Sequence, residues 1–227
     1  MDERKKLILN TIIKEHIKTG SPVGSGVLVE KYKLNISPAT ARNEMSSLEE
    51  EGYIAQPHTS AGRIPTELAY KFYLENIKPL KIKKQESDHL LKILKVKEEK
   101  NLKEVARLVS EISGLAVFWA FHRHNLFYTG ISNLFHQPEF AELELIYNIS
   151  SVIDGLDDII DNIYEDVQEG LNTFVGSDNP FGAFTSTVLA KYRFDDKIGI
   201  FGILGPIRMD YEKNIALIEF IFRELNN

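Results

Sequence analysis

The sequence contains no cysteine among its 227 residues. Disulfide scaffolds, zinc sites built on thiolates and cysteine nucleophiles are therefore excluded. It also lacks any apolar stretch approaching the roughly 20 residues that a membrane-spanning helix needs. The first apolar run is interrupted by Asn10, Lys14 and Glu15, so we expect no signal peptide, no membrane association and a cytoplasmic location.

Basic residues are scarce in the second half of the chain. Residues 1–78 carry 11 Lys+Arg and 10 Asp+Glu, residues 79–107 carry 9 and 5, and residues 108–227 carry 7 and 18. A DNA polyanion is attracted to the first part and repelled by the last. This distribution favours a nucleic-acid module in front of a module of another kind.

The first 78 residues have the outline of a winged helix-turn-helix, in which three helices precede two strands joined by a polar loop. Apolar spacing predicts a first helix that stops at Gly20, a second over residues 25–32 and a third over residues 37–51. Ser37 suits the N-cap of the third helix and Pro38 its first position. Short strands at residues 53–56 and at Ile64 flank the loop, and a fourth helix follows.

The rest of the chain mixes helices and strands, which predicts an α+β fold. The lysine-rich residues 79–112 are expected to form a connecting helix between the DNA-binding domain, residues 1–78, and a second domain, residues 113–227. In that domain we expect strands at residues 115–121, 125–129 and 173–175, and a hairpin over residues 186–204. Helices are expected at residues 139–148, 152–168 and 210–225.

The third helix carries the pattern that favours DNA. Ala41, Met45 and Leu48 fall on one side, and the other side is small or hydrogen-bonding. Such a face can enter a major groove, where arginine pairs with guanine and asparagine with adenine. Any solvated helix face is polar, but this one has no acid before Glu44, whereas an ordinary surface helix favours acids in its first turn. We expect the base edges to be read by Arg42, Asn43, Ser46 and Ser47. Ala39 is on the same DNA-contacting face, where small residues permit close approach.

The loop over residues 57–64 is the candidate wing. Its polar side chains can reach phosphates or the minor groove, although a plain hairpin turn has the same composition. We expect the DNA backbone to be contacted by Ser37, Thr40, His58, Thr59, Ser60 and Arg63. A hydrolytic pair of His58 with Ser60 is disfavoured because no nearby acid is placed to orient the histidine.

We expect no catalytic site, no cofactor and no metal. His122, His124 and His136 lack the close histidine or carboxylate spacing of a metal site and are read as solvated. Arg208 and Asp210 are expected to form a structural ion pair.

Several segments together resemble one family, the bacterial heat-inducible transcription repressors HrcA. In the first half these are Pro22–Ser25, Ser37–Met45 and Pro57–Thr66; in the second half they are Tyr128–Leu134 with Gln137–Phe140, Val175–Asn179, and Gly205–Tyr211. The resemblance covers nearly the whole chain, in the family's order. It implies a winged-helix domain with recognition helix 37–51 and wing 57–64, followed by a GAF-like domain. It also implies a homodimer that represses chaperone genes from an inverted-repeat operator, with the chaperonin as a possible partner.

Two departures from the family pattern stand out. Gly26 occupies a position where members usually carry arginine, which removes one backbone contact. The family's early GAF strands and inserted dimerisation module would lie between Phe121 and Asn125, where this chain has only a short link. The resemblance therefore implies a short form with a reduced GAF-like domain.

Other functions are weighed beside repression. In a small-molecule-responsive regulator of GAF type, Thr129, Ser132, Asn133 and Asn179 would line a polar pocket. Winged helices also serve protein contacts, and a steep fall of affinity with salt would favour DNA over that alternative.

Overall fold

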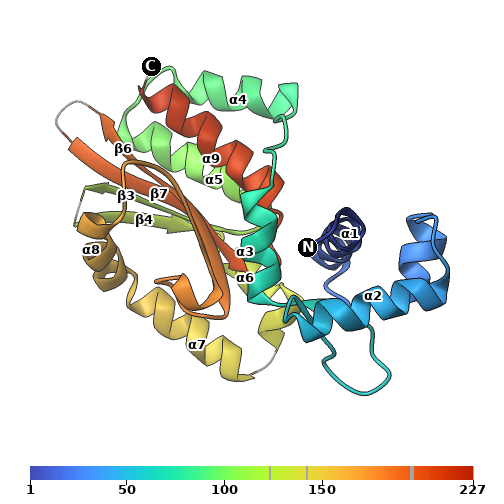
Figure 1. The fold of residues 1–227 in the computed structure, drawn as a ribbon. Helices are drawn as coiled ribbons and strands as arrows, with labels where there is room; N and C mark the ends of the chain where they lie inside the picture. The colour runs from blue at the N-terminus through green and yellow to red at the C-terminus, as the bar shows by residue number, and fades with distance from the viewer. Residues whose placement is uncertain (123, 142, 195–196, 227) are drawn as a thin grey trace. The chain divides into compact units, whose positions relative to one another are not determined.

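The computed structural model describes residues 1–122, 124–141, 143–194 and 197–226. The chain divides into two compact units, the smaller unit Met1–Ile77 and the larger unit Lys78–Asn227. Figure 1 shows the helices of the smaller unit in blue to cyan and the sheet of the larger unit.

The smaller unit is built on helices whose ends follow from their sequence. Helix α1 (Glu3–Thr19) begins where the Asp2 carboxylate accepts a hydrogen bond from the Lys5 N–H, and it ends at Gly20 in the left-handed conformation. A short π-helical turn, η1 (Val27–Lys31), stands where a second helix is expected. Helices α2 (Pro38–Glu50) and α3 (Glu67–Glu75) follow.

Two short strands complete this unit. Strand β1 (Ile54–Ala55) pairs antiparallel with β2 (Ile64–Pro65), and Val23 adds a bridge to Arg63, the residue before β2. The order of three helical segments, strand, loop and strand is that of a winged helix-turn-helix.

The larger unit contains one antiparallel sheet with the strand order β4-β3-β7-β6-β5. Its strands are β3 (Ala116–His122), β4 (Asn125–Thr129), β5 (Gly170–Val175), β6 (Thr185–Phe194) and β7 (Lys197–Pro206). The link residue 123, and residues 195 and 196 of the predicted hairpin, lie outside the described residues. Each predicted strand has a counterpart here, and the chain is an α+β protein as expected.

Helices cover both faces of the sheet (Figure 1). On one face α5 (Glu99–Ser113) contacts β3, α9 (Tyr211–Asn226) contacts β6, and α4 (Lys84–Leu94) packs on both helices. The other face is covered by α6 (Ile131–Phe135), η2 (Pro138–Ala141), α7 (Leu143–Asp154) and α8 (Leu156–Asp166). There the core contains Phe118 and Leu189 of the sheet with Leu134, Ile149 and Ile160 of the helices.

The lysine-rich segment differs from the expected connecting helix. It forms two helices, α4 and α5, that belong to the larger unit. The reason is that both are amphipathic: Leu90 and Leu94 of α4, and Val105 and Val109 of α5, are buried while the lysines stay at the surface. Among the described residues, no helix has the length and apolar character that crossing a membrane requires.

Candidate nucleic-acid interface

Helix α2 begins as its sequence predicts. The Ser37 hydroxyl accepts a hydrogen bond from the Thr40 N–H at 3.0 Å, and Pro38 occupies the first turn. Ala41, Met45 and Leu48 are buried, and burial of a side chain such as Leu48 contributes about 1.5–3 kcal/mol. These contacts hold α2 in one rotational setting and decide which of its residues face solvent.

The solvent face of α2 carries the predicted base-reading residues and Ala39. Ala39, Arg42, Asn43 and Ser46 are exposed, and Ser47 is half-buried. Within the described part of the chain, no residue forms a hydrogen bond or ion pair with the side chains of Arg42, Asn43 or Ser46. Their donors and acceptors are therefore available to base edges. Ser47 differs, because its hydroxyl donates to the Glu51 carboxylate at 3.3 Å.

Three of the four acids in this helix and at its end form ion pairs, whereas Glu50 is exposed and forms none among the described residues. Glu44 lies 3.6 Å from Arg4 and Glu49 lies 2.8 Å from Arg63, while Glu51 pairs with Lys5. The hydrogen bond from Lys5 lowers the pKa of the Glu51 carboxyl below its ordinary value. Ion pairing reduces the repulsion that these carboxylates would exert on DNA phosphates.

The wing is a tight turn that presents polar side chains. The Ala61 N–H donates to the His58 carbonyl at 3.0 Å, and Ser60 takes a positive φ of 71°. The Gln56 amide donates to the Ala61 carbonyl at 3.1 Å and closes the loop from the other side. His58, Thr59 and Ser60 are exposed at its tip, as a backbone-contacting wing requires.

The base of the wing is fixed to the segment before η1. Val23 and Arg63 exchange two backbone hydrogen bonds of 2.8 and 2.9 Å. A Cβ atom on Gly62 would lie 2.5 Å from the carbonyl carbon of Val23, so this approach requires glycine. The β2 side of the wing is therefore held by backbone contacts with Val23 as well as with β1.

Arg63 is placed differently from the other predicted DNA contacts. Its guanidinium Nε donates to the Glu49 carboxylate at 2.9 Å, and its Nη2 lies 2.8 Å from the same carboxylate. The pair ties the wing to the C-terminal half of α2. Two of its donor nitrogens, Nε and Nη2, are therefore directed at Glu49.

A cleft of about 350 Å³ lies between α2 and the wing. It brings together three predicted site residues from distant parts of the sequence, Arg42 of α2 and Ser60 and Arg63 of the wing. It also includes Ser25 and Gln56, which sequence reasoning did not single out. Their positions in the sequence could have indicated them, because Ser25 follows Gly24 directly and Gln56 directly precedes the wing. The lining consists of Gly24, Ser25, Arg42, Met45, Gln56, Ser60, Ala61, Gly62 and Arg63.

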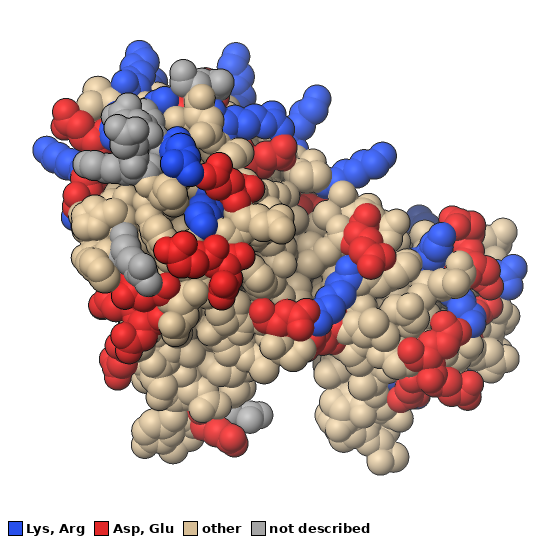
Figure 2. Space-filling view, turned by 60° about the vertical axis from the view of Figure 1, so that its left-hand side comes forward, with Lys and Arg blue, Asp and Glu red and all other residues tan. Residues whose placement is uncertain are grey.

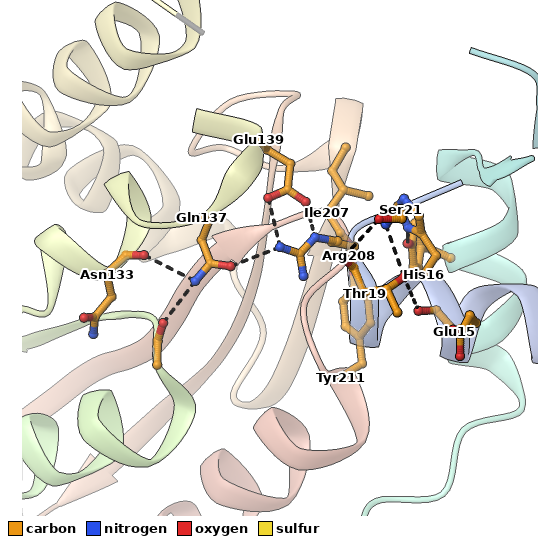
Figure 3. A network of polar contacts seen from close by, with 12 residues as sticks. Glu15, His16, Thr19, Ser21, Asn133, Gln137, Glu139, Ile207, Arg208 and Tyr211 are labelled. Atoms are coloured by element: carbon orange, nitrogen blue, oxygen red, sulfur yellow. Dashed lines mark hydrogen bonds and ion pairs between the residues drawn. The ribbon is translucent and has the colours of Figure 1, made fainter. Parts of the chain in front are cut away.

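In the larger unit, a polar network joins two of the segments that carry the family resemblance (Figure 3). The Arg208 guanidinium pairs with the Glu139 carboxylate and donates to the Gln137 side-chain oxygen at 3.2 Å. Gln137 in turn donates to the Asn133 carbonyl at 3.3 Å. Arg208 does not pair with Asp210 as expected. The Asp210 carboxylate instead accepts a hydrogen bond from the Lys213 N–H and caps α9.

The same network reaches the buried end of α5. The Asn133 amide donates to the Ser110 hydroxyl at 3.2 Å and to the Leu115 carbonyl at 3.3 Å. A Cβ on Gly130 would lie 1.9 Å from the Ser110 hydroxyl, so glycine is required there as well. The contacts of Gly130 and Asn133 give the Tyr128–Leu134 segment a structural role. Among the described residues, no cluster of three histidines, aspartates or glutamates is arranged to hold a metal ion.

Comparison with known proteins identifies relatives of the whole chain. The family model for the HrcA protein C terminal domain matches residues 73–215. The heat-inducible transcription repressor HrcA of Carboxydothermus hydrogenoformans is 26% identical, with 100% of this chain and 97% of the relative covered. The HrcA of Desulforamulus reducens is 28% identical over 100% of this chain and 96% of the relative. That of Moorella thermoacetica is 43% identical over 51% of this chain and 35% of the relative.

The lengths of these alignments show that the relatives contain sequence that this chain lacks. The first runs over 334 positions, whereas this chain has 227 residues, so the relative contains a long stretch without a counterpart here. A crystal structure described as that of a hypothetical protein shares the fold, with a TM-score of 0.78 at 18% identity, and 99% of this chain and 97% of that chain covered.

The relatives are named as transcription repressors and not as enzymes. Because the family model covers more than half of the residues, and curated relatives align along the full length, the assignment rests on both units. The chain belongs to the HrcA family of heat-inducible transcription repressors.

Proposed function

We propose that this protein represses heat-shock (chaperone) genes by binding an inverted-repeat operator as a homodimer. The single observation that carries the proposal is the solvent face of α2. On this face the side chains of Arg42, Asn43 and Ser46 have no hydrogen-bond or ion-pair partner among the described residues. Glu44 and Glu49 of the same helix, and Glu51 directly after it, are each held in an ion pair. Operator DNA lies in the cytoplasm, so we place the protein there.

The proposal divides the contacts by role. Arg42, Asn43, Ser46 and Ser47 read base edges, and Ala39 permits close approach to the groove floor. The backbone is contacted by Ser37, Thr40, His58, Thr59 and Ser60. Arg63 supports these contacts through Glu49 by holding the wing.

A two-fold symmetric operator follows from the geometry of such a dimer. Two recognition helices enter major grooves that lie about 34 Å apart, or a multiple of that, on one side of the duplex. Symmetry of the protein then requires symmetry of the DNA site.

Substitution of Asn43 tests the assignment. We expect Asn43→Ala to weaken operator binding by about 1–3 kcal/mol and to relax base preference at one position per half-site. Gel-shift titrations against single-base operator variants measure both. The matched control is Asn226→Ala, an exposed asparagine of the larger unit, which should leave binding unchanged. Equal weakening on every operator variant would assign Asn43 to the backbone instead.

Control by the chaperonin completes the proposal, and it rests on the family resemblance. A repressor of marginal stability depends on a chaperonin to stay competent, and heat diverts the chaperonin to unfolded clients. Operator binding by purified protein should then rise when chaperonin is added. An unchanged affinity across the heat-shock temperature range would count against this control.

A small-molecule-responsive regulator is the alternative. Two of the four residues that would line its pocket are engaged within the larger unit. The Asn133 amide donates to Ser110 and Leu115, and the Asn179 amide donates to the Thr185 hydroxyl at 2.7 Å. These bonds favour a structural role for both asparagines. A thermal-shift screen with small metabolites discriminates, because a ligand that raises the unfolding temperature would support the alternative.

A further inference from the structure

Helix α7 has two apolar faces, and only one of them is used by the fold. Leu145, Ile149, Val152 and Ile153 recur at helical spacing and pack on the core of the larger unit. On the opposite side, Leu143 is 70% exposed and Tyr147 is 68% exposed. Exposure of two large apolar side chains one turn apart is the pattern of a helix face that a partner covers.

The small polar residues on α7 do not make this face more polar. The Ser150 hydroxyl donates to the Ile146 carbonyl at 2.8 Å, and the Ser151 hydroxyl donates to the Tyr147 carbonyl at 3.0 Å. Both donors are therefore satisfied within the helix. These two serines therefore add no unmet hydroxyl donor to the exposed side of the helix.

The charge around this face has one sign. Residues 125–190 contain no lysine or arginine, and they contain 11 aspartates and glutamates. Asp154 at the end of α7 and Asp157 and Asp158 at the start of α8 are exposed, and within the described ranges none of the three is in an ion pair. Figure 2 shows the basic side chains of the larger, left-hand unit gathered toward its top, with red and tan below.

A second copy of the chain does not suit this surface. In an antiparallel two-fold pairing of α7 with itself, Glu144 of each copy would approach Asp154 and its acidic neighbours on the other. Like charges brought together at an interface disfavour association. The same field repels nucleic acid.

We infer that the exposed face of α7, together with the adjoining acidic start of α8, docks a basic amphipathic helix of a partner protein. The partner's apolar side chains would cover Leu143 and Tyr147, and its lysines or arginines would lie against Asp154, Asp157 and Asp158. This inference is independent of operator binding, which it assigns to the other unit.

A synthetic helix of the stated chemistry tests the inference on the full chain. The probe is a fluorescein-labelled 14-residue peptide of leucine and lysine with all its leucines on one side, and the readout is fluorescence anisotropy. We expect saturable binding that weakens as salt rises. Leu143→Ser with Tyr147→Ser should weaken it at least fivefold. Asp154→Asn with Asp157→Asn and Asp158→Asn should weaken it and flatten its salt dependence.

Matched controls lie on the opposite helical layer. Leu91→Ser on α4 removes an exposed leucine, and Glu98→Gln with Glu104→Gln and Glu111→Gln removes three exposed acids at α5. Both should leave peptide binding unchanged, and operator binding should be the same in every variant. All the substituted side chains are exposed, and circular dichroism verifies folding.

Three results would overturn the inference. The first is equal binding by the parent and the Leu143/Tyr147 variant. The second is equal binding of a peptide with the same composition but scrambled order, which would show charge attraction alone. The third is self-association of the parent chain in sedimentation that Tyr147→Ser abolishes, which would assign the face to a second copy.

Discussion

Gly62 lies where the wing passes closest to the segment before η1. An added Cβ would lie 2.5 Å from the Val23 carbonyl carbon, and backbone cannot give way as a flexible side chain does. We expect Gly62→Ala to destabilise the smaller unit by about 1–3 kcal/mol. Urea unfolding measures this change. Gly24→Ala is the control, because a Cβ there meets nothing within 4 Å. Unchanged stability in Gly62→Ala would contradict the close packing.

Glu15 links the stability of the smaller unit to pH. Its buried carboxylate accepts hydrogen bonds from the Lys31 ammonium at 2.5 and 2.8 Å and from the Tyr32 hydroxyl at 2.7 Å. The bond from Lys31, then that from Tyr32, lowers the Glu15 pKa below its ordinary 4.5. Burial, with Glu15 beside it, raises the pKa of the Tyr32 hydroxyl to about 12.

A carboxyl whose pKa is lowered by folding stabilises the fold above its unfolded pKa. This contribution is lost as the pH falls below about 4.5 and through the lower folded value. We expect Glu15→Gln to lose about 1 kcal/mol of unfolding free energy at pH 7 and to flatten the decline on the acid side. Urea unfolding from pH 3 to 7 measures both. Glu30→Gln, at an exposed position, is the control, and a parallel decline in Glu15→Gln would refute the linkage.

At the scale of elements, α2 and the wing act as one piece because Glu49 joins Arg63. If Arg63 holds the wing, Arg63→Ala and Glu49→Ala should lower operator affinity by similar amounts, and the double variant should lose no more than either. A coupling of about 0.5–1 kcal/mol is expected, since Arg63 is 19% and Glu49 35% exposed and solvent screens the pair. A double-mutant cycle of gel shifts measures it. A salt slope reduced by about 1 in Arg63→Ala alone would instead make Arg63 a phosphate contact.

Elements were predictable where local chemistry decides them. The serine–proline start of α2 and its stripe of Ala41, Met45 and Leu48 locate that helix from the sequence, because capping and 3.6-residue periodicity act within a few turns. The break between α4 and α5 was not predicted. The many lysines of these helices are typical of a solvated linker. Only their packing on α9 and the sheet shows that the apolar residues of both helices are buried.

At the scale of the whole molecule, the proposed dimer has a measurable stoichiometry. We expect sedimentation to give two chains on a palindromic duplex and a weaker complex on a single half-site, since the second recognition helix has no site there. Affinity should fall steeply with salt because lysines and arginines replace counterions on phosphates. A single chain on the palindrome, at saturating protein, would exclude the symmetric arrangement.

Local sequence was enough to establish the winged-helix outline, the α+β class and the polar face of α2, since each depends on contacts within a few residues. The partnerships over long separations came from the folded chain alone. Arg63 pairs with Glu49, Arg208 pairs with Glu139 and not with Asp210, and Gly62 packs against Val23. Sequence spacing cannot rank such partners, because packing of distant elements sets which opposite charge or backbone group comes within reach.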